Sequence, residues 1–228
     1  MEIKLEHYSN INVIESFLKN NKVSDYNTFK KKDSLVLNIA NEKYSKEQLK
    51  ILKRHFSFHD IFYWSSKGLE NVILWEKANR IPDVLAEFNY LFKNIDFDLI
   101  TSIEARGFIL GGIFAREFLK SFITIRKYKE IYDTLPGYKY NYVNWKGKEE
   151  SLYIFKHSIK EGKVIVVDDI IETGSSLKAA EAMLARYNIE IKGAFYLMDT
   201  TESNIRRSFD FPIRSLLRYN DLFNNTQI

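Results

Sequence analysis

The sequence predicts an α/β fold in which a central, mostly parallel sheet is flanked by helices. From residue 98 onward, short segments of apolar β-formers alternate with segments of helical periodicity, which is typical of parallel sheets with crossover helices. Within that region, residues 164–180 read as a strand, a polar turn and a helix. The expected strands are residues 98–103, 121–125, 152–155, 164–167 and 191–197, and the expected helices are residues 108–119 and 175–187.

The residues before this region read as several short elements. Residues 34–40 have the pattern of a short strand, and Ser45 begins a capping box that opens a helix. A further helix is expected from Pro82, because proline is favoured in the first turn. We therefore predict an N-terminal appendage of residues 1–75, followed by the α/β domain over residues 76–228.

The composition excludes several kinds of site. The 228 residues include no cysteine, which excludes a disulfide framework, a thiolate zinc site and a cysteine nucleophile. Hydrophobic residues make up 45% of the chain and charged residues 28%, which is a globular profile. No apolar segment approaches the ~18 residues of a membrane span, and residues 1–4 lack the apolar core of a signal peptide. We expect a cytoplasmic protein with no membrane contact.

Residues 164–180 combine groups that suit a ribose 5-phosphate. An apolar strand runs into two adjacent carboxylates, Asp168 and Asp169, and the turn Thr173-Gly174-Ser175-Ser176 then opens a helix. Gly174 lets the backbone turn its N–H groups inward, and the flanking hydroxyls add donors. A helix N-terminus favours a phosphate there, whereas the carboxylates suit two sugar hydroxyls. We expect both carboxylates to be accessible to solvent. The alternative interpretation is an ordinary strand end with solvated carboxylates.

This segment resembles the phosphoribosyl-pyrophosphate (PRPP) motif of the type I phosphoribosyltransferases. Residues 102–115, SIEARGFILGGIFA, resemble the pyrophosphate-binding loop of the adenine phosphoribosyltransferases. Residues 125–127 resemble the basic segment of that family, residues 135–137 its flexible loop, and residues 211–217 its last strand. The motifs stand in the same order as in the family, over about half of the chain.

The resemblance, over roughly residues 98–219, implies the type I phosphoribosyltransferase fold with residues 1–75 as an N-terminal hood or appendage. It implies a purine-salvage glycosyltransferase that joins a base to PRPP, giving a nucleoside 5′-monophosphate and pyrophosphate. It also implies Mg²⁺ as cofactor, bound mainly through substrate and water, with Asp168 and Asp169 as the carboxylates that could contact it. The expected partners are PRPP, a nucleobase and a second copy of the chain in a homodimer.

The resemblance also assigns roles residue by residue. The acidic pair would hold the ribose hydroxyls, and the turn from Thr173 to Ser176 would hold the 5-phosphate. Arg106, together with Arg126 and Lys127, would neutralise the leaving pyrophosphate. The Glu104–Ala105 peptide bond, one residue before Arg106, is expected to be cis.

The base-binding half departs from the family. Residues 67–77 loosely match the hood segment that frames adenine, which makes Leu74 and Trp75 candidate base contacts. Asn144 stands where adenine enzymes carry a loop glutamate, and Glu172 stands where hypoxanthine-guanine enzymes keep an acid facing purine N7. Glu172 is a candidate general acid or base, the alternative being a carboxylate that stabilises a helix start. Adenine is the favoured base, with hypoxanthine, guanine or another nucleobase as alternatives.

Residues 127–150 are polar and aromatic, with Pro136-Gly137 in the middle and no helical periodicity. A stretch of this length without secondary structure is unusual unless it is functional. We predict an active-site lid that is mobile without ligand, orders with PRPP and excludes water from the reaction.

Two other classes of function stay open. One is a non-catalytic regulator that senses PRPP or a nucleotide, with residues 1–75 contacting nucleic acid through the basic positions Lys46, Lys50, Lys53 and Arg54. The lack of a clear helix-turn-helix pattern disfavours nucleic acid as a partner. The other is a structural or interaction protein that keeps the fold and has lost turnover, which the presence of the acidic pair argues against. Pyrophosphate release from PRPP in the presence of a base separates an enzyme from both.

Overall fold

The computed structural model describes residues 1–6, 14–15, 18–19, 21–31, 34–58, 62–65, 68–72, 78–144, 146–158 and 161–218. The chain divides into two compact units, one of Met1–Glu87 with Leu216–Ile228 and one of Phe88–Ser215. The domain boundary expected from the sequence, between residues 75 and 76, stays a prediction.

The first unit contains a three-stranded antiparallel sheet with the strand order β1-β3-β2. Its strand β3 (Ser34–Ile39) confirms the strand expected at residues 34–40. Leu5, Leu37 and Leu52 are fully buried in the core of this unit. The other elements are β1 (Glu2–Glu6), β2 (Tyr26–Lys31), η1 (Asn41–Lys43), α2 (Lys46–Ser57), the paired strands β4 (Phe62–Ser65) and β5 (Gly68–Val72), η3 (Ala78–Arg80) and the start of α3 (Ile81–Phe92).

Helix α2 begins with the capping box expected from the sequence. Ser45 Oγ accepts a hydrogen bond from the Gln48 N–H at 3.1 Å, and Gln48 Oε1 accepts one from the Ser45 N–H at 2.9 Å. The two bonds satisfy backbone donors that a helix N-terminus would otherwise leave open. Leu52 and Phe56 then pack into the core of the unit.

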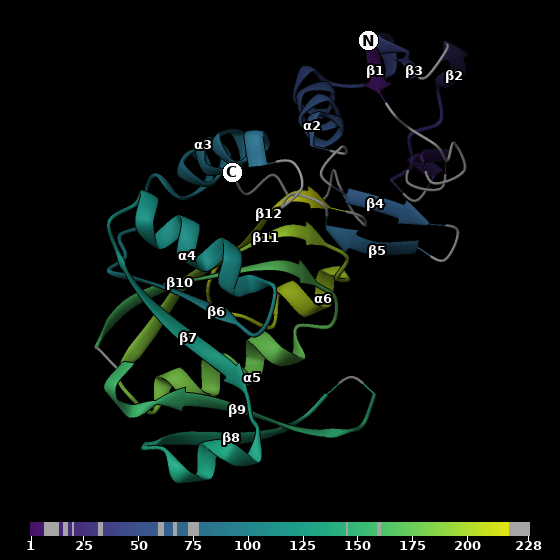
Figure 1. The fold of residues 1–228 in the computed structure, drawn as a ribbon. Helices are drawn as coiled ribbons and strands as arrows, with labels where there is room; N and C mark the ends of the chain where they lie inside the picture. The colour runs from purple at the N-terminus through teal and green to yellow at the C-terminus, as the bar shows by residue number, and fades with distance from the viewer. Residues whose placement is uncertain are drawn as a thin grey trace. The chain divides into compact units, whose positions relative to one another are not determined.

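The second unit is built on a seven-stranded sheet with the order β12-β11-β10-β6-β7-β9-β8 (Figure 1). The four strands from β11 to β7 are parallel, whereas β9 and β8 pair antiparallel at one edge. The strands are β6 (Leu99–Ile103), β7 (Ser121–Lys127), β8 (Gly137–Val143), β9 (Glu149–Phe155), β10 (Gly162–Ile171), β11 (Ile189–Asp199) and the start of β12 (Ile213–Arg218). The helices are α4 (Gly107–Glu117), η4 (Glu130–Thr134), η5 (Lys156–Ser158), α5 (Ser175–Ala185) and α6 (Ser203–Arg206). The mostly parallel α/β sheet expected from the sequence is confirmed.

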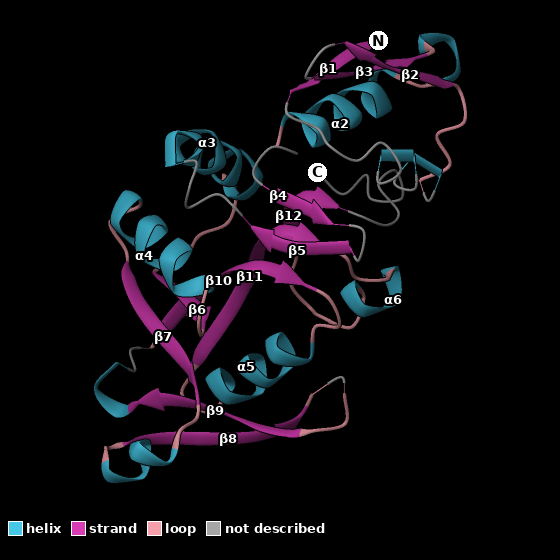
Figure 2. Ribbon diagram, turned by 45° about the vertical axis from the view of Figure 1, so that its right-hand side comes forward, coloured by secondary structure: helices cyan, strands magenta, loops and turns pink. Residues whose placement is uncertain are grey.

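Helices α4 and α5 cover opposite faces of this sheet (Figure 2). Neighbouring residues of β11 contact different helices, because successive strand residues point to opposite faces of the sheet. Phe195 packs against Phe114 of α4, with ring centroids 5.5 Å apart. Its neighbours Ala194 and Tyr196 are buried in the apolar cluster that contains Leu177 and other α5 residues. The loops at the carboxyl ends of β6 and β10 therefore lead into helices on opposite faces of the sheet.

Two expectations about secondary structure are wrong. Strand β10 does not end before Asp168 but continues to Ile171. Residues 127–150 are not an irregular loop, because they form η4, strand β8 and the start of β9. The signal that was missed is a period of two along β8, where Tyr138, Tyr140 and Tyr142 all pack against the cluster that includes α5. Among the described residues, no helix is long and apolar enough to cross a membrane.

Candidate active site

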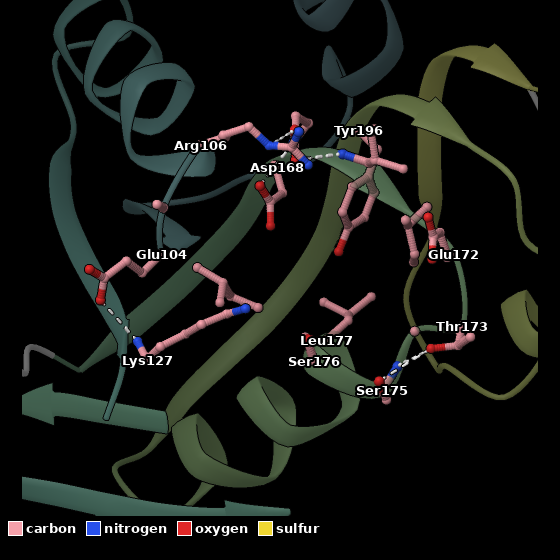
Figure 3. Close-up of a pocket in the computed structure, with 16 residues that line it drawn as sticks. Glu104, Arg106, Lys127, Asp168, Glu172, Thr173, Ser175, Ser176, Leu177 and Tyr196 are labelled. Carbon is pink, nitrogen blue, oxygen red and sulfur yellow. Dashed lines mark hydrogen bonds and ion pairs between the residues drawn. The ribbon is translucent and has the colours of Figure 1, made fainter. Parts of the chain in front are cut away.

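A cavity of about 380 Å³ opens at the carboxyl ends of β6, β7 and β10 (Figure 3). This edge is where parallel α/β sheets place their ligands, and the volume is in the range of small-molecule sites. The lining residues are Ile103, Glu104, Ala105, Arg106, Lys127, Asp168, Asp169, Ile170, Ile171, Glu172, Thr173, Gly174, Ser175, Ser176, Leu177 and Tyr196.

The turn from Thr173 to Ser176, predicted to hold a phosphate, lies at the N-terminus of α5. Gly174 has φ +71° and ψ 2°, in the left-handed region where a side chain is strained. A Cβ on Gly174 would also lie 3.1 Å from Ile205 and 3.3 Å from Phe209, which are tight contacts, so the backbone conformation and the surroundings both favour glycine. The Thr173 and Ser175 hydroxyl oxygens lie 3.2 Å apart. Hydroxyl groups and the N-terminus of α5 thus meet at the cavity, which suits an anion.

The acidic pair is more enclosed than expected. Asp169 is only 5% exposed, so the expectation that both carboxylates are accessible to solvent is wrong for this residue. Its Oδ2 lies 2.6 Å from Arg106 Nε, which compensates the buried charge. Asp168 is half-buried, and its Oδ1 accepts a hydrogen bond from the Asp169 N–H at 2.9 Å. Burial, followed by the charge of Asp169, raises the pKa of Asp168 well above its usual range.

The loop between β6 and α4 presents Arg106 and Glu104 to the cavity. The Glu104–Ala105 peptide bond is cis, which confirms the expectation. The Glu104 carboxylate accepts a hydrogen bond from the Lys127 N–H at 3.1 Å and lies 3.8 Å from Lys129 Nζ. Glu104 therefore ties this loop to the end of β7.

Arg126 has a different environment from the one expected. Its guanidinium carbon lies 5.5 Å from the ring centroid of Phe108, 5.8 Å from that of Phe155 and 6.0 Å from that of Tyr132. Its Nη1 also lies 3.9 Å from Glu104 Oε1. The structure does not bring Arg126 to the cavity lining, so its role toward pyrophosphate stays a prediction.

Of the candidate base contacts, the structure describes only Asn144. Asn144 lies in the turn between β8 and β9, where its Oδ1 accepts hydrogen bonds from the N–H groups of Lys146 and Lys148. Its Nδ2 donates to Glu150 at 2.8 Å, and Asn144 is not part of the cavity lining. Leu74 and Trp75 lie outside the described residues. The assignment of these residues to the base stays a prediction.

Tyr196 is the polar cavity residue that sequence reasoning missed. It sits on β11 directly across from Asp168 in the parallel register. A usable signal existed, because Tyr196 carries a polar group within the otherwise apolar run of residues 194–198. Strand register, however, cannot be read from the sequence alone.

More acidic than basic side chains line the cavity. Four carboxylates line it, from Glu104, Asp168, Asp169 and Glu172, against the two cations of Arg106 and Lys127. A free polyanion would meet net repulsion there. A phosphate ligand that arrives with a divalent cation would meet less repulsion.

Comparison with known proteins identifies the family. The family model described as the phosphoribosyl transferase domain matches residues 75–213. The chain belongs to this family. It is 34% identical over 128 residues to the adenine phosphoribosyltransferase of Pseudothermotoga lettingae, across 55% of this chain and 74% of that relative. It is 32% identical over 145 residues to the adenine phosphoribosyltransferase of Nitrosopumilus maritimus, across 62% of this chain and 82% of that relative.

The fold comparison agrees with the sequence comparison. The crystal structure of adenine phosphoribosyltransferase from Thermoanaerobacter pseudethanolicus matches with a TM-score of 0.63 at 20% identity, over 72% of this chain and 98% of that chain. The type I phosphoribosyltransferase fold and the closeness to the adenine phosphoribosyltransferases, both expected from the sequence, are confirmed. The chain is a phosphoribosyltransferase.

Proposed function

We propose that this phosphoribosyltransferase joins adenine to PRPP, giving adenosine 5′-monophosphate (AMP) and pyrophosphate. The observation that carries the proposal is the cavity, in which an acidic pair and an anion-binding turn follow one another on a single strand–turn–helix unit. The adenine phosphoribosyltransferases at 34% and 32% identity support adenine as the base. Glu172 lines the cavity and keeps hypoxanthine or guanine as the alternative base.

The lining residues suit the charge changes of this reaction. As the bond from the anomeric carbon to pyrophosphate breaks, the sugar gains positive character and the leaving group gains negative charge. The turn from Thr173 to Ser176 holds the 5-phosphate, while Asp168 and Asp169 accept hydrogen bonds from the sugar hydroxyls. Arg106, about half exposed at 46%, stabilises the leaving pyrophosphate together with Lys127.

Glu172 is proposed to take the proton released when the base attacks. Its carboxylate is exposed and lines the cavity one residue before the phosphate turn. A carboxylate within reach of a proton in transfer can act as a general base. The alternative role, stabilising the start of α5, requires no contact with the base.

Magnesium fits this cavity as an ion that enters with PRPP. Among the described residues, no group of three or more His, Asp or Glu side chains is arranged to hold a metal. Asp168 and Asp169 are the carboxylates that would contact it, and the excess of acid in the lining favours a cation there. When bound, the ion would neutralise the pyrophosphate charge. The homodimer and the cytoplasmic location stay predictions, and light scattering of the purified chain tests the former.

A nucleobase panel tests the proposed function. The chain is incubated with PRPP, Mg²⁺ and adenine, hypoxanthine, guanine or no base, and released pyrophosphate is measured. We expect release with adenine and little without a base. The double variant Asp168→Asn with Asp169→Asn should lose this turnover. A matched control is Asp96→Asn with Asp98→Asn, which changes carboxylates that bond to Lys163 outside the cavity lining and should keep it.

A further inference from the structure

We infer that the Tyr196 hydroxyl is a further ligand of the substrate, donating a hydrogen bond to the 5-phosphate. This inference rests on the proposed function, because that phosphate belongs to the ribose 5-phosphate part of PRPP. Tyr196 lines the cavity although the residue is only 2% exposed. Figure 3 shows its hydroxyl end pointing away from β11 into the cavity. The ring is therefore held by packing, and the polar end is what a ligand can reach.

The strand register places this hydroxyl between the acidic pair and the turn from Thr173 to Ser176. Strands β10 and β11 are parallel and pair Asp168 with Tyr196, so the two side chains leave the sheet on the same face. Tyrosine is longer by an aromatic ring, so its hydroxyl stands further from the sheet than the Asp168 carboxylate. The apolar cluster that buries Tyr196 also contains Leu177, in the first turn of α5. The hydroxyl thus extends from the sugar end of the cavity toward the phosphate turn.

The hydroxyl is also an unused donor. Within the part of the chain that the structure describes, Tyr196 makes no side-chain hydrogen bond, although buried tyrosine hydroxyls normally have a partner. Burial, followed by the charges of Asp168 and Asp199, raises the pKa of Tyr196 well above its usual range. The group therefore keeps its proton at neutral pH. Phosphate oxygens are the strongest acceptors on ribose 5-phosphate, and a neutral donor can approach them without bringing further negative charge.

Ligand titrations of Tyr196→Phe test the inference, because this variant removes the hydroxyl and keeps the ring. Isothermal titration with ribose 5-phosphate, AMP and adenosine is compared with the unaltered chain. Loss of a hydrogen bond to a charged group should weaken ribose 5-phosphate and AMP about ten- to one-hundred-fold, with adenosine affinity unchanged. The matched control is Tyr187→Phe, a tyrosine that packs against Tyr138 at 4.4 Å between ring centroids and does not line the cavity. This control should bind all three ligands normally, and both variants should melt within a degree or two of the unaltered chain.

The outcomes separate this inference from the proposed function. Equal ribose 5-phosphate affinity in Tyr196→Phe and the unaltered chain overturns the inference. An equal loss of AMP and adenosine affinity also overturns it, because the hydroxyl would then serve the sugar or base. No ribose 5-phosphate binding by the unaltered chain overturns it as well. If binding depends on Tyr196 but PRPP and adenine give no pyrophosphate, the inference stands and the proposed function fails.

Discussion

A methyl group added at Gly107 should displace the Asp168 carboxylate and reduce turnover. Gly107 is the first residue of α4. A Cβ there would lie 2.5 Å from Asp168 Oδ1 and 2.9 Å from its Cγ. Since ordinary contacts begin at 3.4 Å, the carboxylate oxygen would have to move by about 0.9 Å (3.4 − 2.5). A displacement of roughly 1 Å in a catalytic group can cost about a hundred-fold in rate.

The expected result for Gly107→Ala is therefore a fall of about a hundred-fold in kcat/KM for PRPP, with a stability loss of about 1–3 kcal/mol from overpacking. Steady-state pyrophosphate release gives the first quantity and chemical denaturation the second. Gly112→Ala is the matched control, because it lies on the same helix and its added Cβ would meet nothing within 4 Å. A folded Gly107→Ala enzyme with kcat/KM within two-fold of the control would show that turnover does not depend on the position of the Asp168 carboxylate.

Three further predictions concern the phosphate turn, the candidate base and the β8–β9 hairpin. Gly174→Ala should lower the free energy of unfolding by about 1–2 kcal/mol, because alanine is disfavoured in the left-handed region, and should raise the KM for PRPP. Denaturation and kinetics that match the unaltered chain would contradict this prediction. Glu172→Gln should lower kcat far more than PRPP affinity, and normal turnover would return Glu172 to the helix-start role. Burial, followed by the hydrogen bond to Glu150, raises the pKa of Tyr142 to about 12 from its ordinary 10. The stability that this shift contributes is present below pH 10 and is lost as the pH rises through 12. The unaltered chain should therefore lose more stability than Tyr142→Phe over that interval, and parallel pH profiles would contradict the shift.

Local chemistry explains what the sequence could predict. The strand, the acidic pair and the turn with Gly174 follow one another along the chain, so short-range rules were enough to predict the turn and a candidate anion site at the start of α5. The capping box at Ser45 was predictable for the same reason, since both of its bonds join residues three apart. The mostly parallel sheet followed from the alternation of strands and helices.

Long-range packing explains what the sequence could not predict. Asp169 is enclosed because Arg106, from a different loop, lies against it at 2.6 Å. Arg126 follows a strand like a phosphate ligand, but rings from Phe108 and Phe155, far apart in the chain, surround it. Tyr196 enters the cavity through its register with Asp168. None of these contacts leaves a pattern along a single segment.

The β8–β9 hairpin shows a different limit. Residues 127–150 lack helical periodicity, which suggested an irregular lid. The alternating tyrosines of β8 instead bury one side of a strand, and Tyr142 donates to Glu150 at 2.7 Å. A lid that closes over PRPP would have to move as a hairpin rather than as a free loop. Whether it moves stays a prediction, which hydrogen exchange with and without PRPP can test.

A crystal structure of the chain with AMP would show which residues hold each part of the nucleotide. We expect the 5-phosphate at the turn from Thr173 to Ser176 and the ribose hydroxyls at Asp168 and Asp169. We also expect a phosphate oxygen within hydrogen-bonding distance of the Tyr196 hydroxyl. AMP bound outside this cavity, or with its phosphate at Arg106 and its base at the turn, would contradict the proposed active site.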